Sequence, residues 1–366
     1  MPEPRTYIFA GGGTGGHLFP GVAVAQELRE LDPAARLLFV GSDKELEQSI
    51  FSRLQLEHRS LPVESLRSLT RHPVRFVTRN WQAWRVARRW IRELQPAVVV
   101  GLGGYASAPI VWAASRIRIP VVLLEQNVIP GRTTRLLSGS SKMVCTSFAE
   151  AIRHLPHGTS IEVTGNPVRR EIAELHNIRP ERKHQELLIL GGSQGADRLN
   201  DAVLGAVSEL RNELSDWHIV HQSGLRQIES LRSAYRDLRL NATVEPFFDD
   251  MKERYQSASL VISRAGATTL AELTCCGLPM ILVPYPQAAD DHQRANAISL
   301  RDNNAAVIVE HKPSPADTAQ DLSTQLAAII ASTEMRQQLS DAAYHLAKPD
   351  AAAVVARRIQ SLTASK

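Results

Sequence analysis

Short apolar, β-branched runs alternate along the chain with longer stretches in which apolar residues recur at helical spacing. The runs expected to form strands are 7–10, 37–40, 97–100, 120–124, 143–145, 187–190, 218–220, 260–263, 280–283 and 306–309. Strands separated by helices of about 10–15 residues form right-handed βαβ units, in which helices cover both faces of a parallel sheet. The pattern therefore predicts an α/β protein throughout.

The predicted strands fall into two groups that open in the same way. The run 7–10 leads into the loop GGGTGG, and the run 187–190 leads into the loop GGSQGA. Two tandem, doubly wound, Rossmann-like domains account for this repetition, and the cleft between two such domains is where a ligand is expected. We expect the first domain over residues 1–164 and the second over 186–345, joined by a proline-containing linker at 165–185.

The composition fits two globular domains and excludes several other classes of protein. The chain has 366 residues, of which 43% are hydrophobic and 22% are charged, so disordered, collagen-like and coiled-coil proteins are excluded. The three cysteines give neither a disulfide framework nor a zinc spacing, which favours a reducing compartment. The sequence contains no D-x-D motif and no His or Cys pair with ligand spacing, so no catalytic metal is expected.

The charge is nearly balanced over the chain but uneven in one segment. Lys and Arg number 42 against 38 Asp and Glu, yet residues 65–92 contain eight arginines, three tryptophans and no acidic residue. One interpretation is an ordinary helix that buries its aromatic face and exposes a basic one. The other is a peripheral membrane patch, with arginines near anionic headgroups and an aromatic side chain at the interface. The residues of that patch would be Arg71, Arg75, Phe76, Arg79 and Trp81. A nucleic-acid surface lacks any accompanying motif, so no nucleic-acid partner is expected.

The first glycine loop, residues 11–16, satisfies G-x-G-x-x-G between a strand and a helix, which alone is a weak signal. Its glycines let backbone N–H groups approach a phosphate. The dinucleotide-binding form also needs an acidic residue about 20 positions later, and Asp43 fits only loosely. A nicotinamide or flavin site and a site for another phosphate-bearing ligand both stay open. His17 follows the loop and is either a capping or solvated residue or a neutral base beside backbone N–H groups.

The second half carries a denser set of candidate anion-binding groups. The stretch 264–272, RAGATTLAE, follows a predicted strand and starts a helix whose first-turn N–H groups and hydroxyls suit a phosphate. Glu272 lies one turn into this helix and can accept hydrogen bonds from two adjacent hydroxyls such as those of a ribose. In the alternative interpretation, Thr268 and Thr269 cap the helix and Glu272 forms a salt bridge. Ser193 in the other loop adds a hydroxyl, and two such loops favour a pyrophosphate.

Taken together, these and further motifs resemble the lipid II-forming N-acetylglucosaminyltransferases of glycosyltransferase family 28. The matching segments occur in the order of the family, from residue 12 to residue 297, so the resemblance covers nearly the whole chain. They are GGTGGHLFPG (12–21), GLGGYAS (101–107), EQN (125–127), TGNPVR (164–169), GGSQGA (191–196), FDDM (248–251), GATT (266–269), DHQ (291–293) and NA (296–297). Leu124 and Phe248 depart from the family, which usually has histidine and isoleucine there.

The resemblance implies a GT-B fold with UDP-N-acetylglucosamine held mainly by the second domain. It also implies that the final helix, 349–364, packs back on the first domain. Tyr105 and Ser107 match the acceptor-side motif, and no cofactor is implied. The implied donor-binding residues are Thr14, Gly15, Gly16, Asn127, Arg169, Ser193, Phe248, Ala267, Thr268, Thr269, Leu270, Ala271, Glu272 and Gln293.

The implied reaction is an inverting, in-line transfer of N-acetylglucosamine to the 4-hydroxyl of N-acetylmuramic acid in lipid I, with His17 as the candidate base. Because lipid I has a polyprenyl anchor, the resemblance implies a peripheral protein on the cytoplasmic face of the bacterial inner membrane, in contact with its anionic surface. A cell-wall synthesis complex is a further possible partner. Three alternatives stay open at this point: a nicotinamide oxidoreductase, a UDP-N-acetylglucosamine 2-epimerase and a non-catalytic nucleotide-sugar sensor.

Overall fold

The structure is a computed structural model that describes residues 4–12, 15–65, 67–179, 185–191 and 196–363. The chain divides into two compact units. The first unit contains residues 1–169 together with 350–366, and the second contains residues 170–349.

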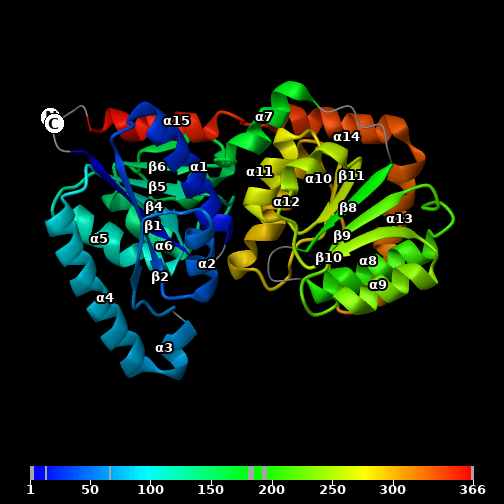
Figure 1. The fold of residues 1–366 in the computed structure, drawn as a ribbon, viewed down its shortest axis with the longest axis horizontal. Helices are drawn as coiled ribbons and strands as arrows, with labels where there is room; N and C mark the ends of the chain where they lie inside the picture. Colours follow the sequence, from blue (N-terminus) through cyan, green and yellow to red (C-terminus); the bar gives the residue numbers. More distant parts are fainter. Residues whose placement is uncertain (1–3, 13–14, 66, 180–184, 192–195, 364–366) are drawn as a thin grey trace. The chain divides into compact units, whose positions relative to one another are not determined.

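The first unit is built on a seven-stranded parallel sheet with the order β3-β2-β1-β4-β5-β6-β7 (Figure 1). Its strands are β1 (Thr6–Gly11), β2 (Arg36–Ser42), β3 (His58–Leu61), β4 (Val98–Gly103), β5 (Val121–Glu125), β6 (Met143–Thr146) and β7 (Ile161–Val163). Its helices are α1 (Gly15–Leu31), α2 (Glu45–Arg53), α3 (Arg67–Arg71), α4 (Pro73–Leu94), α5 (Ala108–Arg116), α6 (Arg132–Leu137) and α15 (Ala351–Ser361), with short 3-10 turns η1 (Tyr105–Ser107), η2 (Ser138–Ser140) and η3 (Ala149–His154).

The side chains of the interior strand β1 point alternately to the two faces of this sheet, and each face is covered by a different set of helices. Tyr7 and Phe9 are buried in one apolar cluster with side chains of α1 and α15. Ile8 and Ala10 are buried in the other, with side chains of α4 and α5. Successive side chains of a strand point to opposite faces, so a continuous apolar run is what a strand covered on both sides requires.

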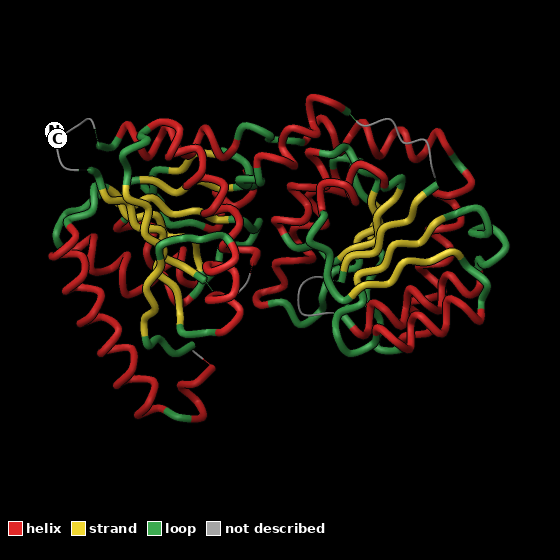
Figure 2. The backbone as a smooth tube through the Cα atoms, viewed as in Figure 1, coloured by secondary structure: helices red, strands yellow, loops and turns green. Residues whose placement is uncertain are grey.

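The second unit repeats this architecture with a six-stranded parallel sheet of order β10-β9-β8-β11-β12-β13. Figure 2 shows the strands of each unit in yellow and the helices in red. Its strands are β8 (Glu186–Leu190), β9 (His218–Gln222), β10 (Asn241–Glu245), β11 (Leu260–Ser263), β12 (Met280–Leu282) and β13 (Val307–Ile308). Its helices are α7 (Arg170–Ile178), α8 (Asp197–Glu209), α9 (Ile228–Asp237), α10 (Met251–Ser257), α11 (Ala267–Cys275), α12 (His292–Asp302), α13 (Pro315–Ala331) and α14 (Thr333–Leu346), with the short turn η4 (Ala289–Asp291).

These two sheets confirm the predicted α/β class with two doubly wound, Rossmann-like halves. Three strands, β3, β7 and β10, were not among the predicted ones, and each is at an edge of its sheet. Edge strands face solvent and need no continuous apolar run, which is why the polar segments HRSL and NATVE give no strand signal.

The last helix, α15, belongs to the first unit although it follows the whole of the second in the sequence. It packs on α1, and its Val355, Ala356 and Ile359 are fully buried there. A search of the described helices for a segment long and apolar enough to cross a bilayer gives none.

Candidate functional site

In the first unit, two glycine-rich loops meet where the strand order reverses, between β1 and β4. Gly103 and Gly104 have φ of +93° and +72°, a region that favours glycine. A Cβ built on Gly104 would lie 2.9 Å from the carbonyl oxygen of Gly12, so the two loops contact each other through their backbones. Ligands of open α/β sheets bind at such a reversal, outside the carboxyl ends of the strands.

His17 lies in the first turn of α1, beside these loops. Its Nδ1 is 3.1 Å from Oε1 of Gln126, a residue that is only 3% exposed. The Nε2 of Gln126 donates to the carbonyl oxygens of Leu102, at 3.3 Å, and Leu124, at 3.5 Å. The imidazole is therefore held at the carboxyl edge of the sheet by a buried amide that is itself bound to β4 and β5.

Tyr105 and Ser107, the candidates for the acceptor side, are in the short turn η1 directly after Gly104. The Ser107 hydroxyl is buried and donates to the Gly104 carbonyl oxygen at 2.9 Å, so it supports the loop after β4. The Tyr105 ring is half-buried, and Nζ of Lys44 lies 5.5 Å from its centre.

Asn127 is positioned by the buried carboxylate of Glu125, at the end of β5. One Glu125 oxygen accepts from the Asn127 backbone N–H at 3.0 Å and from its side-chain amide at 3.3 Å. The other accepts from the Gly131 backbone N–H at 3.0 Å. Glu125 thus organises the whole loop 127–131.

Arg169, another donor-site candidate, is near α1. Its guanidinium lies 5.4 Å from the centre of the Phe19 ring on that helix.

A second buried carboxylate, that of Glu47 on α2, lies against the first glycine loop. Its oxygens accept from the Ser42 hydroxyl at 2.6 Å and the Ser42 backbone N–H at 2.7 Å. A Cβ on Gly12 would lie 2.3 Å from a Glu47 oxygen, so the position accepts only glycine while this carboxylate stays in place. Asp43, the candidate partner for a dinucleotide ribose, forms an ion pair in which its carboxylate oxygen is 2.8 Å from the guanidinium of Arg79.

In the second unit the strand order reverses between β8 and β11, and α11 begins immediately after β11. Its N-cap is Gly266, in an extended conformation, so neither Thr268 nor Thr269 occupies the N-cap position. Ala267 and Leu270 are buried, and Ala271 is half-buried. The buried Glu272 carboxylate accepts from the Tyr255 hydroxyl of α10 at 2.9 Å. Tyr255 is therefore a residue of this site that sequence reasoning missed.

Two further donor-site candidates, Phe248 and Gln293, are also in the second unit. Phe248 is buried, and the guanidinium of Arg254 lies 4.9 Å from the centre of its ring. The Gln293 side-chain oxygen accepts from the backbone N–H of Tyr285 at 2.9 Å.

Arg264 lies in the loop after β11, and its side chain donates to the Val283 carbonyl oxygen at 2.9 Å. Burial lowers the pKa of its guanidinium to about 10. These contacts gather Arg264, Tyr285 and Gln293 around the carboxyl ends of β11 and β12.

Gly15 and Gly16 are in the first turn of α1. The remaining two donor-site candidates, Thr14 and Ser193, lie outside the described residues. A search of the described part of the chain for three or more His, Cys, Asp or Glu side chains able to hold a metal ion gives no group.

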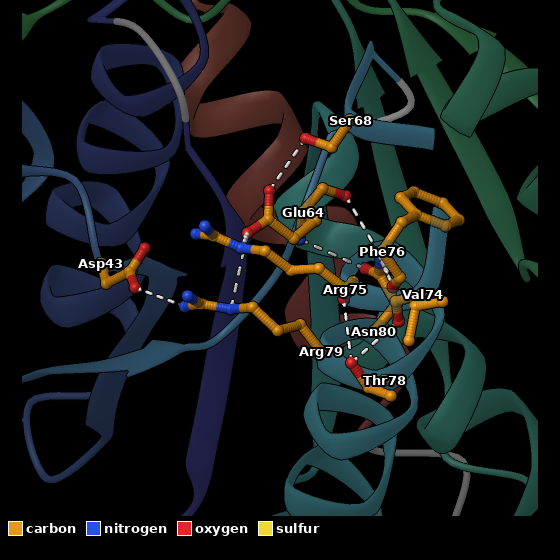
Figure 3. Close-up of polar contacts among 9 residues, drawn as sticks. All are labelled: Asp43, Glu64, Ser68, Val74, Arg75, Phe76, Thr78, Arg79 and Asn80. Carbon is orange, nitrogen blue, oxygen red and sulfur yellow. Dashed lines mark hydrogen bonds and ion pairs between the residues drawn. The ribbon is translucent and has the colours of Figure 1, made fainter. Parts of the chain in front are cut away.

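Two arginines of the predicted membrane patch, both on the basic helix α4, form ion pairs with carboxylates. Arg75 binds the Glu64 carboxylate at 2.9 Å, and Arg79 binds both Asp43, at 2.8 Å, and Glu64, at 3.6 Å (Figure 3). The basic side that carries Arg75 and Arg79 is therefore partly neutralised. Arg71 is exposed, Phe76 is half-buried, and Trp81 is 58% exposed.

Further along α4, arginines and tryptophans face a groove between α4 and α5. The rings of Trp84 and Trp112 are 5.5 Å apart, with Arg88 over the first and Arg116 over the second, each between 5 and 6 Å from the ring centre. The groove has a volume of about 350 Å³, and Ala113 and Ile117 complete its lining. This arrangement combines apolar surface with cationic groups, which is the composition of a surface that meets an anionic interface.

The comparisons with known proteins agree over both units. Residues 7–146 match the glycosyltransferase family 28 N-terminal domain, and residues 186–355 match its C-terminal domain. A relative from Anaeromyxobacter dehalogenans, named UDP-N-acetylglucosamine--N-acetylmuramyl-(pentapeptide) pyrophosphoryl-undecaprenol N-acetylglucosamine transferase, is 41% identical over 95% of this chain and 91% of its own. A Bacillus cereus protein with the same name, numbered 1, is 34% identical over 94% and 96%.

The solved structures give the same result. The crystal structure of Acinetobacter baumannii MurG is 30% identical, covers 98% of this chain and 100% of its own, and has a TM-score of 0.77. The UDP-GlcNAc 2-epimerase from Neisseria meningitidis bound to UDP-GlcNAc has a TM-score of 0.68 at 13% identity over 98% and 100%, which shows a shared fold alone. Fold and site thus define an α/β protein of two Rossmann-like halves, each with candidate ligand-binding loops at its strand-order reversal. The chain belongs to glycosyltransferase family 28.

Proposed function

We propose that the protein transfers N-acetylglucosamine from UDP-N-acetylglucosamine to the 4-hydroxyl of N-acetylmuramic acid in the undecaprenyl-pyrophosphoryl pentapeptide substrate, lipid I, and so forms lipid II. The observation that carries this proposal is the likeness, over nearly the whole chain, to relatives named for this transfer. The buried contacts around His17 and Glu272 support it, because each orients a polar side chain at the carboxyl edge of a sheet.

In the proposed reaction the acceptor oxygen forms a bond to the anomeric carbon while the bond from that carbon to the UDP phosphate breaks. The electron pair leaves with UDP, the proton of the acceptor hydroxyl passes to His17, and the configuration at the carbon inverts. Glu272 accepts hydrogen bonds from the ribose hydroxyls, and first-turn N–H groups of α11 stabilise the diphosphate. Phe248 and Gln293 contribute to the uracil and sugar subsites, respectively.

The test is transfer of labelled N-acetylglucosamine to a lipid I analogue, with His17→Ala as the variant. We expect a large fall in turnover with nearly unchanged affinity for UDP-N-acetylglucosamine. Turnover within a few-fold of the wild type would remove His17 as the base. Epimerisation of the donor without acceptor would favour the 2-epimerase, NADH binding without UDP binding would favour an oxidoreductase, and donor binding without either reaction would leave a sensor.

We further propose that the protein binds the anionic cytoplasmic face of the inner membrane through the groove between α4 and α5 and the adjoining exposed side chains of α4. The pairing of Arg75 and Arg79 with carboxylates places the available positive charge beside the tryptophans instead. Each arginine near an anionic surface contributes about 1 kcal/mol. The double variant Arg88→Glu/Arg116→Glu is therefore expected to weaken binding to phosphatidylglycerol vesicles by roughly 30-fold or more.

The matched control for this experiment is Arg75→Glu/Arg79→Glu, which makes the same change of charge on α4 but outside the lining of the groove. We expect it to weaken vesicle binding less, because the wild-type arginines are already paired. All four arginines are in the first unit, so circular dichroism and thermal unfolding report whether each variant is still folded. Equal losses for both pairs would show that net charge, and not the aromatic groove, directs membrane binding.

A further inference from the structure

The side chain of Gln126 can satisfy its neighbours in only one orientation. Its amide group lies between two backbone carbonyl oxygens, those of Leu102 and Leu124, and the Nδ1 atom of His17. Carbonyl oxygens only accept hydrogen bonds, so the NH₂ end of the amide must face them. Turning the amide round would place its oxygen against two other oxygens in a buried site and remove both of these hydrogen bonds. The Gln126 oxygen therefore faces His17.

This orientation decides which nitrogen of His17 carries the proton. An amide oxygen is only an acceptor, so Nδ1 must be the donor across the 3.1 Å contact. A neutral imidazole has one N–H group, and its second nitrogen then holds a lone pair. The buried amide thus selects the Nδ1–H form, whereas free neutral histidine prefers the Nε2–H form.

The backbone of the loop after β4 restricts the same ring from a second side. A Cβ built on Gly103 would lie 3.2 Å from Nδ1 of His17, and one on Gly104 would lie 3.8 Å from its Cδ2. The imidazole is therefore packed against two glycines whose positive φ angles bring bare backbone next to it. Its position comes from this packing, and its proton arrangement comes from Gln126.

We propose that Gln126 is a positioning residue that fixes His17 in the Nδ1–H tautomer and so presents Nε2 as the proton acceptor. This inference rests on the proposed function, in which Nε2 takes the proton of the acceptor hydroxyl as the new glycosidic bond forms and UDP leaves. A neutral amide suits this role because its oxygen accepts a hydrogen bond from Nδ1–H without adding a negative charge that would favour the doubly protonated ring.

The direct test is nitrogen NMR of the full-length protein labelled with ¹⁵N-histidine, at a pH where the ring is neutral. The His17 signals are assigned by their loss in His17→Gln. In the wild type we expect a protonated Nδ1 and an unprotonated Nε2. In Gln126→Leu the acceptor is gone, so the Nε2–H form should become populated, and turnover should fall by roughly 10- to 100-fold with the KM for UDP-N-acetylglucosamine nearly unchanged.

The matched variant is Gln126→Glu, which keeps an oxygen facing Nδ1 and can, when protonated, also donate to a carbonyl. It should keep the Nδ1–H proton, which a general loss of packing would not predict. A wild-type Nε2–H tautomer, or a tautomer unchanged in Gln126→Leu, overturns the inference. Failure of the proposed function looks different: the tautomers would follow this pattern while the wild type transfers no sugar to lipid I.

Discussion

Substituting Glu272 by glutamine tests most directly how this protein recognises a nucleotide. The variant keeps the size of the side chain and removes the negative charge from a carboxylate that is 6% exposed and hydrogen-bonded to Tyr255. Hydrogen bonds to a charged group contribute about 1.5–3 kcal/mol each. Loss of one such bond to a ribose hydroxyl corresponds to a decrease in UDP affinity of roughly 10- to 150-fold.

The assay is calorimetric titration with UDP and with 2′,3′-dideoxy-UDP. Glu272→Gln should reduce the affinity for UDP strongly and that for the dideoxy nucleotide little, because the second ligand lacks the hydroxyls. Tyr255→Phe should give a smaller loss with the same dependence on ligand, since it removes one contact that orients the carboxylate. Glu253→Gln, on the exposed face of α10, is the control. Equal losses for both nucleotides would refute the reasoning and assign Glu272 to the fold.

Two further predictions concern buried groups. Burial lowers the pKa of His221 from 6.5 to about 3. Below pH 6.5 the unfolded chain therefore takes up a proton that the folded chain does not, so the free energy of unfolding decreases as the pH is lowered. Between pH 7 and pH 5 the free energy of unfolding should decrease by about 2 kcal/mol, which urea unfolding measures. An equally steep decrease in the variant His221→Gln would contradict this prediction. Gly12→Ala brings a Cβ against the Glu47 carboxylate. It should lower the free energy of unfolding by about 1–3 kcal/mol and remove most transfer activity, while UDP binding stays intact. Full transfer activity in this variant would contradict the prediction.

The central part of each sheet was predictable from the sequence, whereas its edges were not. Strands such as β1 and β8 are buried on both faces, so their residues must be continuously apolar. Strands β3 and β10 are held through backbone hydrogen bonds to a single neighbour, which the side chains do not encode. The Glu47 carboxylate beneath Gly12 was not predictable for another reason, because this contact joins segments about 35 positions apart.

The candidate site was predictable where a motif is local and not where contacts join distant segments. The sequence placed His17 after a glycine loop and Glu272 one turn into a helix, and the structure has both there. It singled out Gln126 only as part of the segment EQN and did not indicate its contact with His17, nor the contact of Tyr255 with Glu272, because these partners are 109 and 17 positions apart. The pairing of Arg79 with Asp43, 36 positions apart, was hidden for the same reason, and the uniform basic character of 65–92 suggested more available charge than the structure leaves.

The place of α15 has a consequence for the order in which the chain can fold. The first unit is interrupted in sequence by the whole second unit, and Val355 and Ile359 of α15 complete the apolar cluster around α1. During synthesis, the second unit can therefore bury its core before the first has all the residues of its own. Until residues 351–361 leave the ribosome, the part of α1 that α15 covers stays exposed, and a chain cut at 349 would keep that part open to water and to aggregation.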